Sequence, residues 1–243
     1  AMQSGKRAVC AGPGNPPVVV DETADPAAAA RDITAGASLD NNIICVDEKE
    51  GFVVQSAADA LLRELSRTGA HLASDAERRR LEATIFTETR GPGRPATITK
   101  ELIGKDAAEI LVRSGLPRVE TPLIVLEVPA DHPLVWTEQL LPVLPVVRVP
   151  DVDAGIELAV RAERGCGHSA AMHSHDIGAL SRMARAVNTS IFVKNGPIVA
   201  GLGEGGEGFT SFTIASPTGE GLTGPLSFSR QRRCVLVDHF RIV

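Results

Sequence analysis

One cysteine of this chain lies where a thiol could meet a substrate rather than only pack. Cys45 follows a polar, turn-forming cluster at 40–42 and precedes a strand-like run at 51–54. A thiolate in such a connection can attack a carbonyl carbon to form a thiohemiacetal, and loss of hydride then gives a thioester. The thiolate form requires positive potential or backbone N–H groups nearby. The alternative is a small buried hydrophobe, and this segment alone does not decide between the two.

A carboxylate and a group of histidines are further candidates. Glu138 lies just ahead of an apolar run at 143–149, where a solvated carboxylate is the usual situation. His168, His173 and His175 lie within eight residues of each other. In a strand His173 and His175 would share one face and His168 the other, and no Cys or carboxylate completes a ligand spacing. We therefore expect no metal site, and instead a strand that lines a cleft.

The glycine-rich segment at 201–206 resembles a phosphate-binding loop. A dinucleotide fingerprint, however, directly follows a strand and opens a helix. Here Ser and Thr residues follow, without a helical pattern. A backbone that a substrate can approach closely is the alternative interpretation.

Composition excludes several classes of function. The net charge of −5 argues against a nucleic-acid partner, and with 3% aromatic residues and no Tyr, stacking on single strands is not expected either. No apolar run reaches the roughly 18 residues of a membrane helix, so we expect no membrane partner. The four cysteines form no CxxC pair. This favours neither a zinc site nor a disulfide framework, and it is typical of a reduced, cytoplasmic compartment.

Short apolar runs alternate with helix-like segments over the 243 residues, which predicts an α/β fold with a mostly parallel sheet. Helix starts are predicted at Asp25, where Pro26 follows, and at Asp151 and Asp176. Strands are expected at 17–21, 51–54, 123–128, 143–149, 170–173, 190–193 and 234–237. Helices are expected at 25–37, 57–68, 75–88, 107–114, 151–164 and 177–187.

Together these segments resemble the aldehyde dehydrogenase superfamily, specifically the CoA-acylating branch of ethanolamine and propanediol utilisation. The resemblance implies an aldehyde-dehydrogenase-like catalytic domain, with a mostly parallel twisted sheet flanked by helices. It is carried, in the family's order, by AGPGNPPVVVDETAD, LDNNIICVDEKE, HPLVWTEQLLPVLPVVRV, GCGHSAAMHS, NTSIFVKNGP and RQRRCVLVDHFRIV.

The resemblance assigns roles to particular residues. Cys45 matches the catalytic thiol, and its backbone N–H matches part of the oxyanion hole. Glu138, four residues before Pro142, matches the carboxylate of the family's E-x-x-x-P motif, which holds the nicotinamide ribose. The residues expected to line the substrate or CoA pocket are Asn42, Ile44, His168 and His173.

One departure from the family concerns deacylation. Hydrolytic members carry a water-activating glutamate where this chain has Cys10. A thiol cannot deprotonate water as a carboxylate does, so the thioester should wait for the thiol of CoA. We therefore interpret Cys10 as structural and expect Cys10→Glu in the full-length enzyme to raise the ratio of free acid to acyl-CoA.

A second departure concerns the family's N-terminal Rossmann-type domain, because no G-x-G-x-x-G unit follows a predicted strand and opens a predicted helix. We expect the chain to be the C-terminal catalytic half of a longer enzyme, inactive by itself. Residues 1–9 would be a linker remnant, 10–221 the catalytic domain, and 222–243 an oligomerisation tail.

The function implied by the resemblance is NAD- and CoA-dependent oxidation of acetaldehyde or propionaldehyde to acyl-CoA. It further implies a homo-oligomer in the cytoplasm or inside a bacterial microcompartment, in contact with shell or cargo proteins. The length of the aldehyde and NAD versus NADP stay open. A non-catalytic assembly or docking module within a microcompartment is the alternative.

Overall fold

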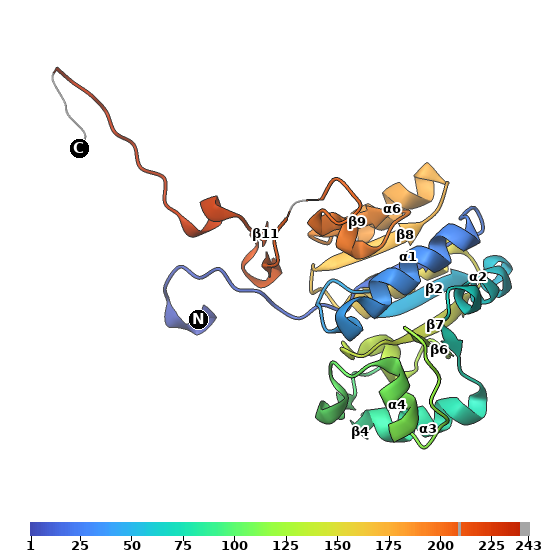
Figure 1. Cartoon of the computed structure of the whole chain (residues 1–243). Coiled ribbons are helices and arrows are strands. Elements are labelled where there is room, and N and C mark those ends of the chain that lie inside the picture. Colours follow the sequence, from blue (N-terminus) through green and yellow to red (C-terminus); the bar gives the residue numbers. More distant parts are fainter. Residues whose placement is uncertain (209, 239–243) are drawn as a thin grey trace.

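A parallel seven-stranded sheet forms the centre of the computed structural model, which describes residues 1–208 and 210–238 (Figure 1). The spatial order is β3-β6-β7-β2-β1-β8-β9, and every neighbouring pair is parallel. This confirms the expected fold class. The strands are β1 (Pro17–Val20), β2 (Glu50–Val54), β3 (His71–Leu72), β6 (Ile124–Glu127), β7 (Val143–Val149), β8 (Ser169–His173) and β9 (Ile191–Lys194).

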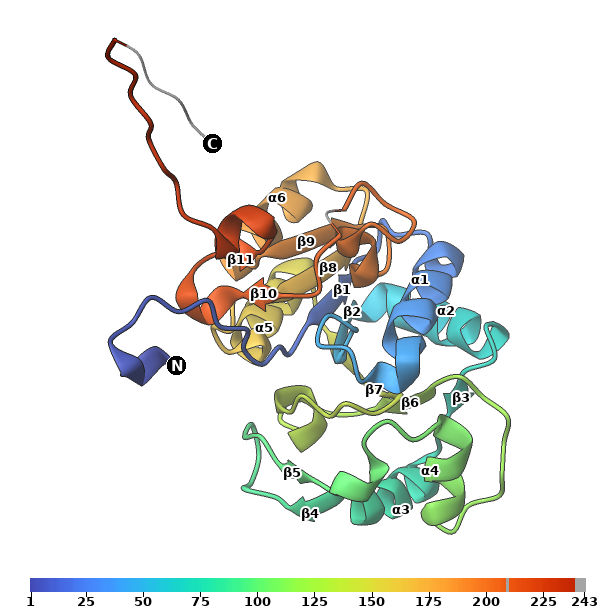
Figure 2. The ribbon, with the colours of Figure 1, turned by 60° about the vertical axis from the view of Figure 1, so that its left-hand side comes forward.

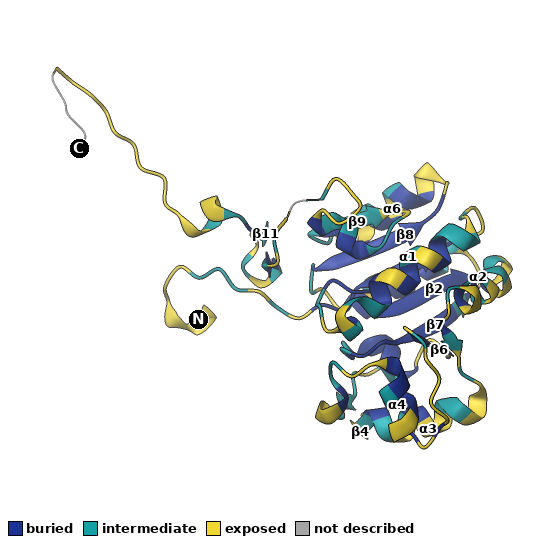
Figure 3. Ribbon diagram, viewed as in Figure 1, coloured by how far each residue is buried: buried dark blue, intermediate teal, exposed yellow. Residues whose placement is uncertain are grey.

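Helices cover both faces of the sheet, so the central strands are buried on both sides and read as continuous apolar runs (Figure 3). Val18 and Val20 belong to the core shared with α1 (Pro26–Ser38) and α2 (Gln55–Arg67). Val19 belongs to the opposite core, shared with α5 (Val152–Glu163) and α6 (Ile177–Val187). The helices α3 (Asp75–Ile85) and α4 (Ala107–Arg113) extend that second core.

The expected helix starts are confirmed. The Asp25 carboxylate accepts hydrogen bonds from the N–H groups of Ala27 and Ala28, and Pro26 occupies the first helical position. Asp151 and Asp176 cap α5 and α6 in the same way. These caps fix where the helices leave the carboxyl ends of the strands.

Three sequence expectations were wrong. The helix expected to reach residue 88 ends at Ile85, since residues Phe86–Glu88 form β4 and pair with β5 (Thr97–Ile98). A short edge strand, β3, had no apolar run to indicate it. Residues 234–237 form no strand; Val235, Leu236 and Val237 are 68%, 61% and 75% exposed, with no neighbouring strand to pair with in the described chain.

The two ends of the chain leave the sheet. The segment before β1 passes beside the hairpin of β10 (Ile214–Ala215) and β11 (Gly221–Leu222), where the Cys10 N–H donates to Thr218 Oγ1 at 3.0 Å (Figure 2). The segment after residue 229 leads away from the body (Figure 1). Residues 239–243, which belong to the predicted oligomerisation tail, lie outside the described residues. None of the described helices is long and apolar enough to cross a bilayer.

Candidate active site

The candidate site lies at the amino ends of four neighbouring strands, β7, β2, β1 and β8. Glu138 precedes β7, Cys45 precedes β2, Gly14 precedes β1, and His168 precedes β8. Because parallel strands begin at the same edge of a sheet, these four loops adjoin although they are far apart in the sequence. Open α/β sheets usually bind ligands at the carboxyl ends of their strands, and this site lies at the opposite edge.

Cys45 is half-buried in a turn between the 3₁₀ helix η2 (Leu39–Asn42) and β2. The expected turn is tight: Asp40, Asn41 and Asn42 have φ of 45°, 56° and 62°, a left-handed conformation that Asn and Asp tolerate best. Burial raises the pKa of the Cys45 thiol, the Glu138 carboxylate adds to this effect, and the Lys49 ammonium opposes it. Burial is thus the main cause that favours the neutral thiol, and the nearby charges of Glu138 and Lys49 act in opposite directions.

Gly14 joins the other three groups. Its N–H donates to Glu138 Oε1 at 3.2 Å. A Cβ atom at this position would lie 2.8 Å from the Cys45 carbonyl oxygen and 2.8 Å from His168 Cγ. Only glycine leaves room for this approach, so the backbone of residue 14 brings the thiol loop, the carboxylate and the imidazole together.

His168 is buried and holds an imidazole nitrogen with no partner. The backbone N–H of His168 donates to Glu163 Oε1 at 2.9 Å, and its ring atom Nδ1 lies 2.9 Å from Ser169 Oγ. Nε2 is buried and has no hydrogen-bond partner among the described residues. Burial, with a contribution from Lys49, lowers the pKa of His168 to about 4. The ring is therefore neutral at pH 7.

A run of four charged residues, 47–50, lies under the Cys45 turn, and all four side chains are 0% exposed. Lys49 Nζ donates to Asn42 O, Asn42 Oδ1 and Ile44 O at 2.9, 2.7 and 3.0 Å. Asp47 Oδ2 accepts the Ile44 N–H at 3.2 Å, and Glu48 Oε1 accepts the Ile198 N–H at 2.8 Å. Burial raises the pKa of Glu48 to about 8.

The other predicted pocket residues lie in different surroundings. Asn42 is buried, and its amide nitrogen donates to Ala37 O and Glu48 O, so its side chain holds the turn together. Ile44 is half-buried beside Cys45. His173 ends β8, at the carboxyl edge of the sheet, and is therefore not brought to the Cys45 cluster. The roles of all six predicted site residues stay predictions.

Two other sequence interpretations can be placed. The glycine-rich segment begins in the last two residues of the 3₁₀ helix η5 (Ile198–Leu202) and turns through positive φ at Gly203 and Gly205, and no α-helix begins there. Within residues 1–208 and 210–238, no three His, Cys, Asp or Glu side chains are grouped so that they could hold a metal ion.

Sequence reasoning missed Gly14 and Lys49. A run of four charges normally indicates a solvated surface, so 47–50 drew no attention. The available signal was position, because the run connects a nucleophile turn directly to a strand that is buried on both faces. For Gly14 the available signal was the sequence Pro13-Gly14-Asn15-Pro16, which stands ahead of another buried strand.

A parallel sheet covered on both faces, with a thiol and a carboxylate at its amino edge, agrees with the fold class expected for an aldehyde dehydrogenase. The aldehyde dehydrogenase family profile matches residues 1–210, and the chain belongs to this family.

Individual relatives narrow the comparison. The chain is 52% identical to the acetylating acetaldehyde dehydrogenase EutE of Salmonella typhimurium over 241 residues, which cover 98% of this chain and 51% of that protein. A crystal structure of Rhodopseudomonas palustris propionaldehyde dehydrogenase, with bound CoA and an acylated cysteine, is 46% identical with a TM-score of 0.90, covering 97% of this chain and 53% of that one.

A third relative is a propionaldehyde dehydrogenase from the fucose utilisation microcompartment of Clostridium phytofermentans, 39% identical with a TM-score of 0.90. That match covers 98% of this chain and 54% of the other. The chain spans about half the length of the curated relatives it matches.

Proposed function

We propose that this chain forms the thiol-bearing half of a CoA-acylating aldehyde dehydrogenase that converts acetaldehyde or propionaldehyde into the acyl-CoA. The observation that carries the proposal is the meeting of Cys45, Glu138 and His168 around Gly14. The relatives named above support it, since one is an acetylating acetaldehyde dehydrogenase and another holds CoA and an acylated cysteine.

Cys45 carries the covalent steps. Its thiolate adds to the aldehyde carbon, the carbon–sulfur bond forms, and the carbonyl oxygen takes up a proton to give the thiohemiacetal. Loss of hydride and of that proton leaves the Cys45 thioester. The thiolate of CoA then attacks the thioester carbonyl, acyl-CoA leaves, and the Cys45 thiolate returns.

Glu138 suits the nicotinamide nucleotide expected as hydride acceptor. Its Oε1 is fixed by the Gly14 N–H, and burial raises the pKa of the Glu138 carboxyl. Carboxylate oxygens accept hydrogen bonds from vicinal ribose hydroxyls, so this side chain fits the sugar next to the nicotinamide. NAD, when bound, supplies the two-electron acceptor.

His168 suits the thiolysis step. The neutral His168 ring has an Nε2 without a partner among the described residues. The ring packs on Gly14, which also packs on the Cys45 carbonyl oxygen. A base at this position would take the proton of the CoA thiol. The glutamate that serves as the base in hydrolytic members is absent, because Cys10 occupies its position. Asn42 and Ile44 would contribute by shaping the turn beside the acyl group.

Assembly belongs to the same proposal. The exposed apolar residues Val235, Leu236 and Val237 are suited to burial against another subunit, which favours residues 222–243 as an oligomerisation tail. The Clostridium relative favours location inside a bacterial microcompartment. A docking module without catalysis is the second candidate, and the same exposed tail would serve it.

A transfer assay tests the proposal without the nicotinamide cofactor. Incubation with propionyl-CoA should move the propionyl group to the Cys45 sulfur and release CoA, and peptide mass spectrometry would locate the adduct. Cys166→Ser and Cys10→Ser should retain the adduct, and Cys45→Ser should lose it. Equal acylation of all four cysteines, or none at all, would contradict the enzyme and favour the docking module.

A further inference from the structure

Lys49 is a fully buried lysine whose three ammonium hydrogens all point to one turn. The acceptors are Asn42 O at 2.9 Å, Asn42 Oδ1 at 2.7 Å and Ile44 O at 3.0 Å. Lysine is almost never fully buried unless it is paired, so this arrangement demands an explanation. Each of its bonds goes to the segment directly before Cys45, and none goes to a packing partner elsewhere.

The turn needs such a partner. Asp40 to Asn42 all have positive φ, and the carbonyls of Asn42 and Ile44 in this segment face the buried Lys49 ammonium. A backbone carbonyl that is buried without a donor costs about 1–3 kcal/mol. The Lys49 ammonium satisfies the carbonyls of Asn42 and Ile44 at once, and thereby fixes two of the last three peptides before the thiol.

The charge of Lys49 also bears on the thiol. The Lys49 charge interacts with the carboxyl groups of Asp47, Glu48 and Glu50 from its own run and of Glu138 from the loop before β7, and also with the His168 ring and the Cys45 thiol. Glu138 and Asp47 oppose ionisation of Cys45, whereas Lys49 favours it. Burial lowers the pKa of Lys49, but the surrounding carboxylates act in the opposite direction.

We infer that Lys49 is a positioning residue for the reaction at Cys45: it holds the turn that presents the thiol and keeps a positive charge beside the thiolate. This inference rests on the proposed function and adds to it a residue that touches no substrate. Thiolates are stabilised by nearby cations, and here the cation is built into the loop that carries the thiol.

The test measures the rate at which iodoacetamide alkylates Cys45, read on the Cys45 peptide, as a function of pH. Three variants are compared with the wild type. K49Q removes the charge but keeps two amide donors. K49R keeps the charge in another geometry. E48Q is the matched control, equally buried in the same loop but bonded to Ile198 rather than to the turn.

We expect the pH midpoint of alkylation to rise in K49Q, so that its rate at pH 7 falls about tenfold for each unit of the shift. K49R and E48Q should keep the wild-type midpoint. If K49Q does not fold, K49R decides alone: an unchanged midpoint supports the inference, and a midpoint displaced to higher pH overturns it.

An unchanged midpoint in folded K49Q would show that Lys49 only supports packing, which overturns the inference while Cys45 is still labelled. Failure of the proposed function has a different signature. In that case the wild type would show no selective reaction of Cys45, whatever residue stands at position 49.

Discussion

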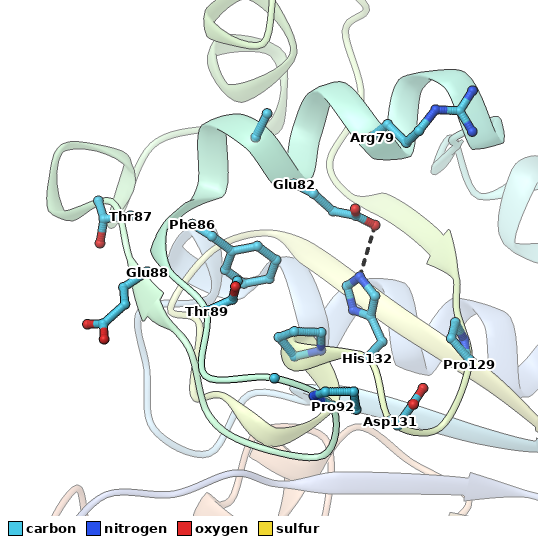
Figure 4. A pocket seen from close by; sticks show the side chains of 13 residues that line it. Arg79, Glu82, Phe86, Thr87, Glu88, Thr89, Pro92, Pro129, Asp131 and His132 are labelled. Carbon is cyan, nitrogen blue, oxygen red and sulfur yellow. Dashed lines mark hydrogen bonds and ion pairs between the residues drawn. The ribbon is translucent and has the colours of Figure 1, made fainter.

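Two regions of this molecule contain a buried histidine beside a glutamate, and they differ in how fully the polar atoms are satisfied. The first is the amino edge with His168. The second, here named the α3 hollow, is a cavity of about 670 Å³ between α3, the β4–β5 hairpin and the loop before the 3₁₀ helix η4 (Pro133–Trp136) (Figure 4). Its lining includes Arg79, Glu82, Phe86, Pro92, Asp131 and His132.

In the α3 hollow both ring nitrogens of His132 have a hydrogen-bond partner. His132 Nε2 lies 2.9 Å from Glu82 Oε1, and His132 Nδ1 accepts the Leu134 N–H at 3.3 Å (Figure 4). His168 instead keeps Nε2 without a partner among the described residues. The comparison teaches that the volume of a cavity is a poor guide to chemistry here, whereas a buried polar atom that is left unbonded is a better one.

The largest expected effect separates the two regions outright. Cys45→Ser should abolish transfer of the propionyl group from propionyl-CoA to the protein, because the hydroxyl is a far weaker nucleophile without an adjacent general base. Arg79→Ala, on the rim of the α3 hollow, should leave the transfer unchanged. Loss of transfer in both variants would mean that the hollow takes part, and the comparison would fail.

The next effect concerns the two histidines. His168→Gln should slow deacylation of the propionyl thioester by CoA about 10²–10⁴-fold, the usual contribution of a positioned base. His132→Gln should leave that rate near the wild-type value and lower the free energy of unfolding by about 0.5–1.5 kcal/mol, since the hydrogen bond between His132 and Glu82 is lost while Glu82 keeps its ion pair with Arg78. Single-turnover deacylation and urea denaturation measure the two quantities. Equal deacylation rates in the two variants would contradict the role of His168.

Gly14→Ala should have a smaller effect, because it displaces groups rather than removing them. The new Cβ would press on the Cys45 carbonyl and the His168 ring. Overpacking of this kind costs about 1–3 kcal/mol of stability, and a displacement near 1 Å lowers rates about 10²-fold. The matched control is Gly51→Ala on β2, whose Cβ would lie 3.6 Å from Val146 Cγ2, an ordinary contact. A Gly14 variant that reacts like the control would show that this approach is unimportant.

The last prediction concerns a pH dependence of stability. Burial raises the pKa of Glu48 to about 8, above its ordinary value of 4.5. The neutral buried carboxyl therefore stabilises the fold fully below pH 4.5, and this contribution is lost as the pH rises toward 8. The free energy of unfolding of the wild type should fall by up to about 1.4 kcal/mol per pH unit in that window, and Glu48→Gln should abolish this fall. Glu82→Gln, at the α3 hollow, is the control, and chemical denaturation at several pH values is the measurement. Parallel pH profiles for wild type and Glu48→Gln would contradict the assignment.

Much of the fold could be predicted from the sequence because the signals were local. Apolar runs and aspartate caps located all six α-helices and six of the seven strands of the central sheet, to within a few residues. The misses lack such signals. β3 has two residues, β4 continues a helical pattern, and residues 234–237 have strand composition but no neighbouring strand among the described residues.

The site was predicted less completely because it depends on strand order. Cys45, Glu138 and His168 precede β2, β7 and β8; β7 and β2 are neighbours in the sheet, and only β1 separates β2 from β8. His173 was grouped with His168 by closeness in sequence, yet the length of β8 separates them. Lys49 was not predicted as part of the site because charged residues are usually exposed, and only the tertiary structure shows that this lysine is fully buried.

The strand order also has a consequence for folding kinetics. The site needs β1 to pair with both β2 and β8, and the second pairing joins Val18 to Ala171 across most of the chain. Closing so long a loop is entropically costly, and contacts of such high sequence separation slow folding. During refolding, Cys45 should therefore react as an ordinary cysteine at first and acquire its native reactivity only when this pairing forms. Pulsed alkylation of this one thiol would then report the moment at which the sheet is complete.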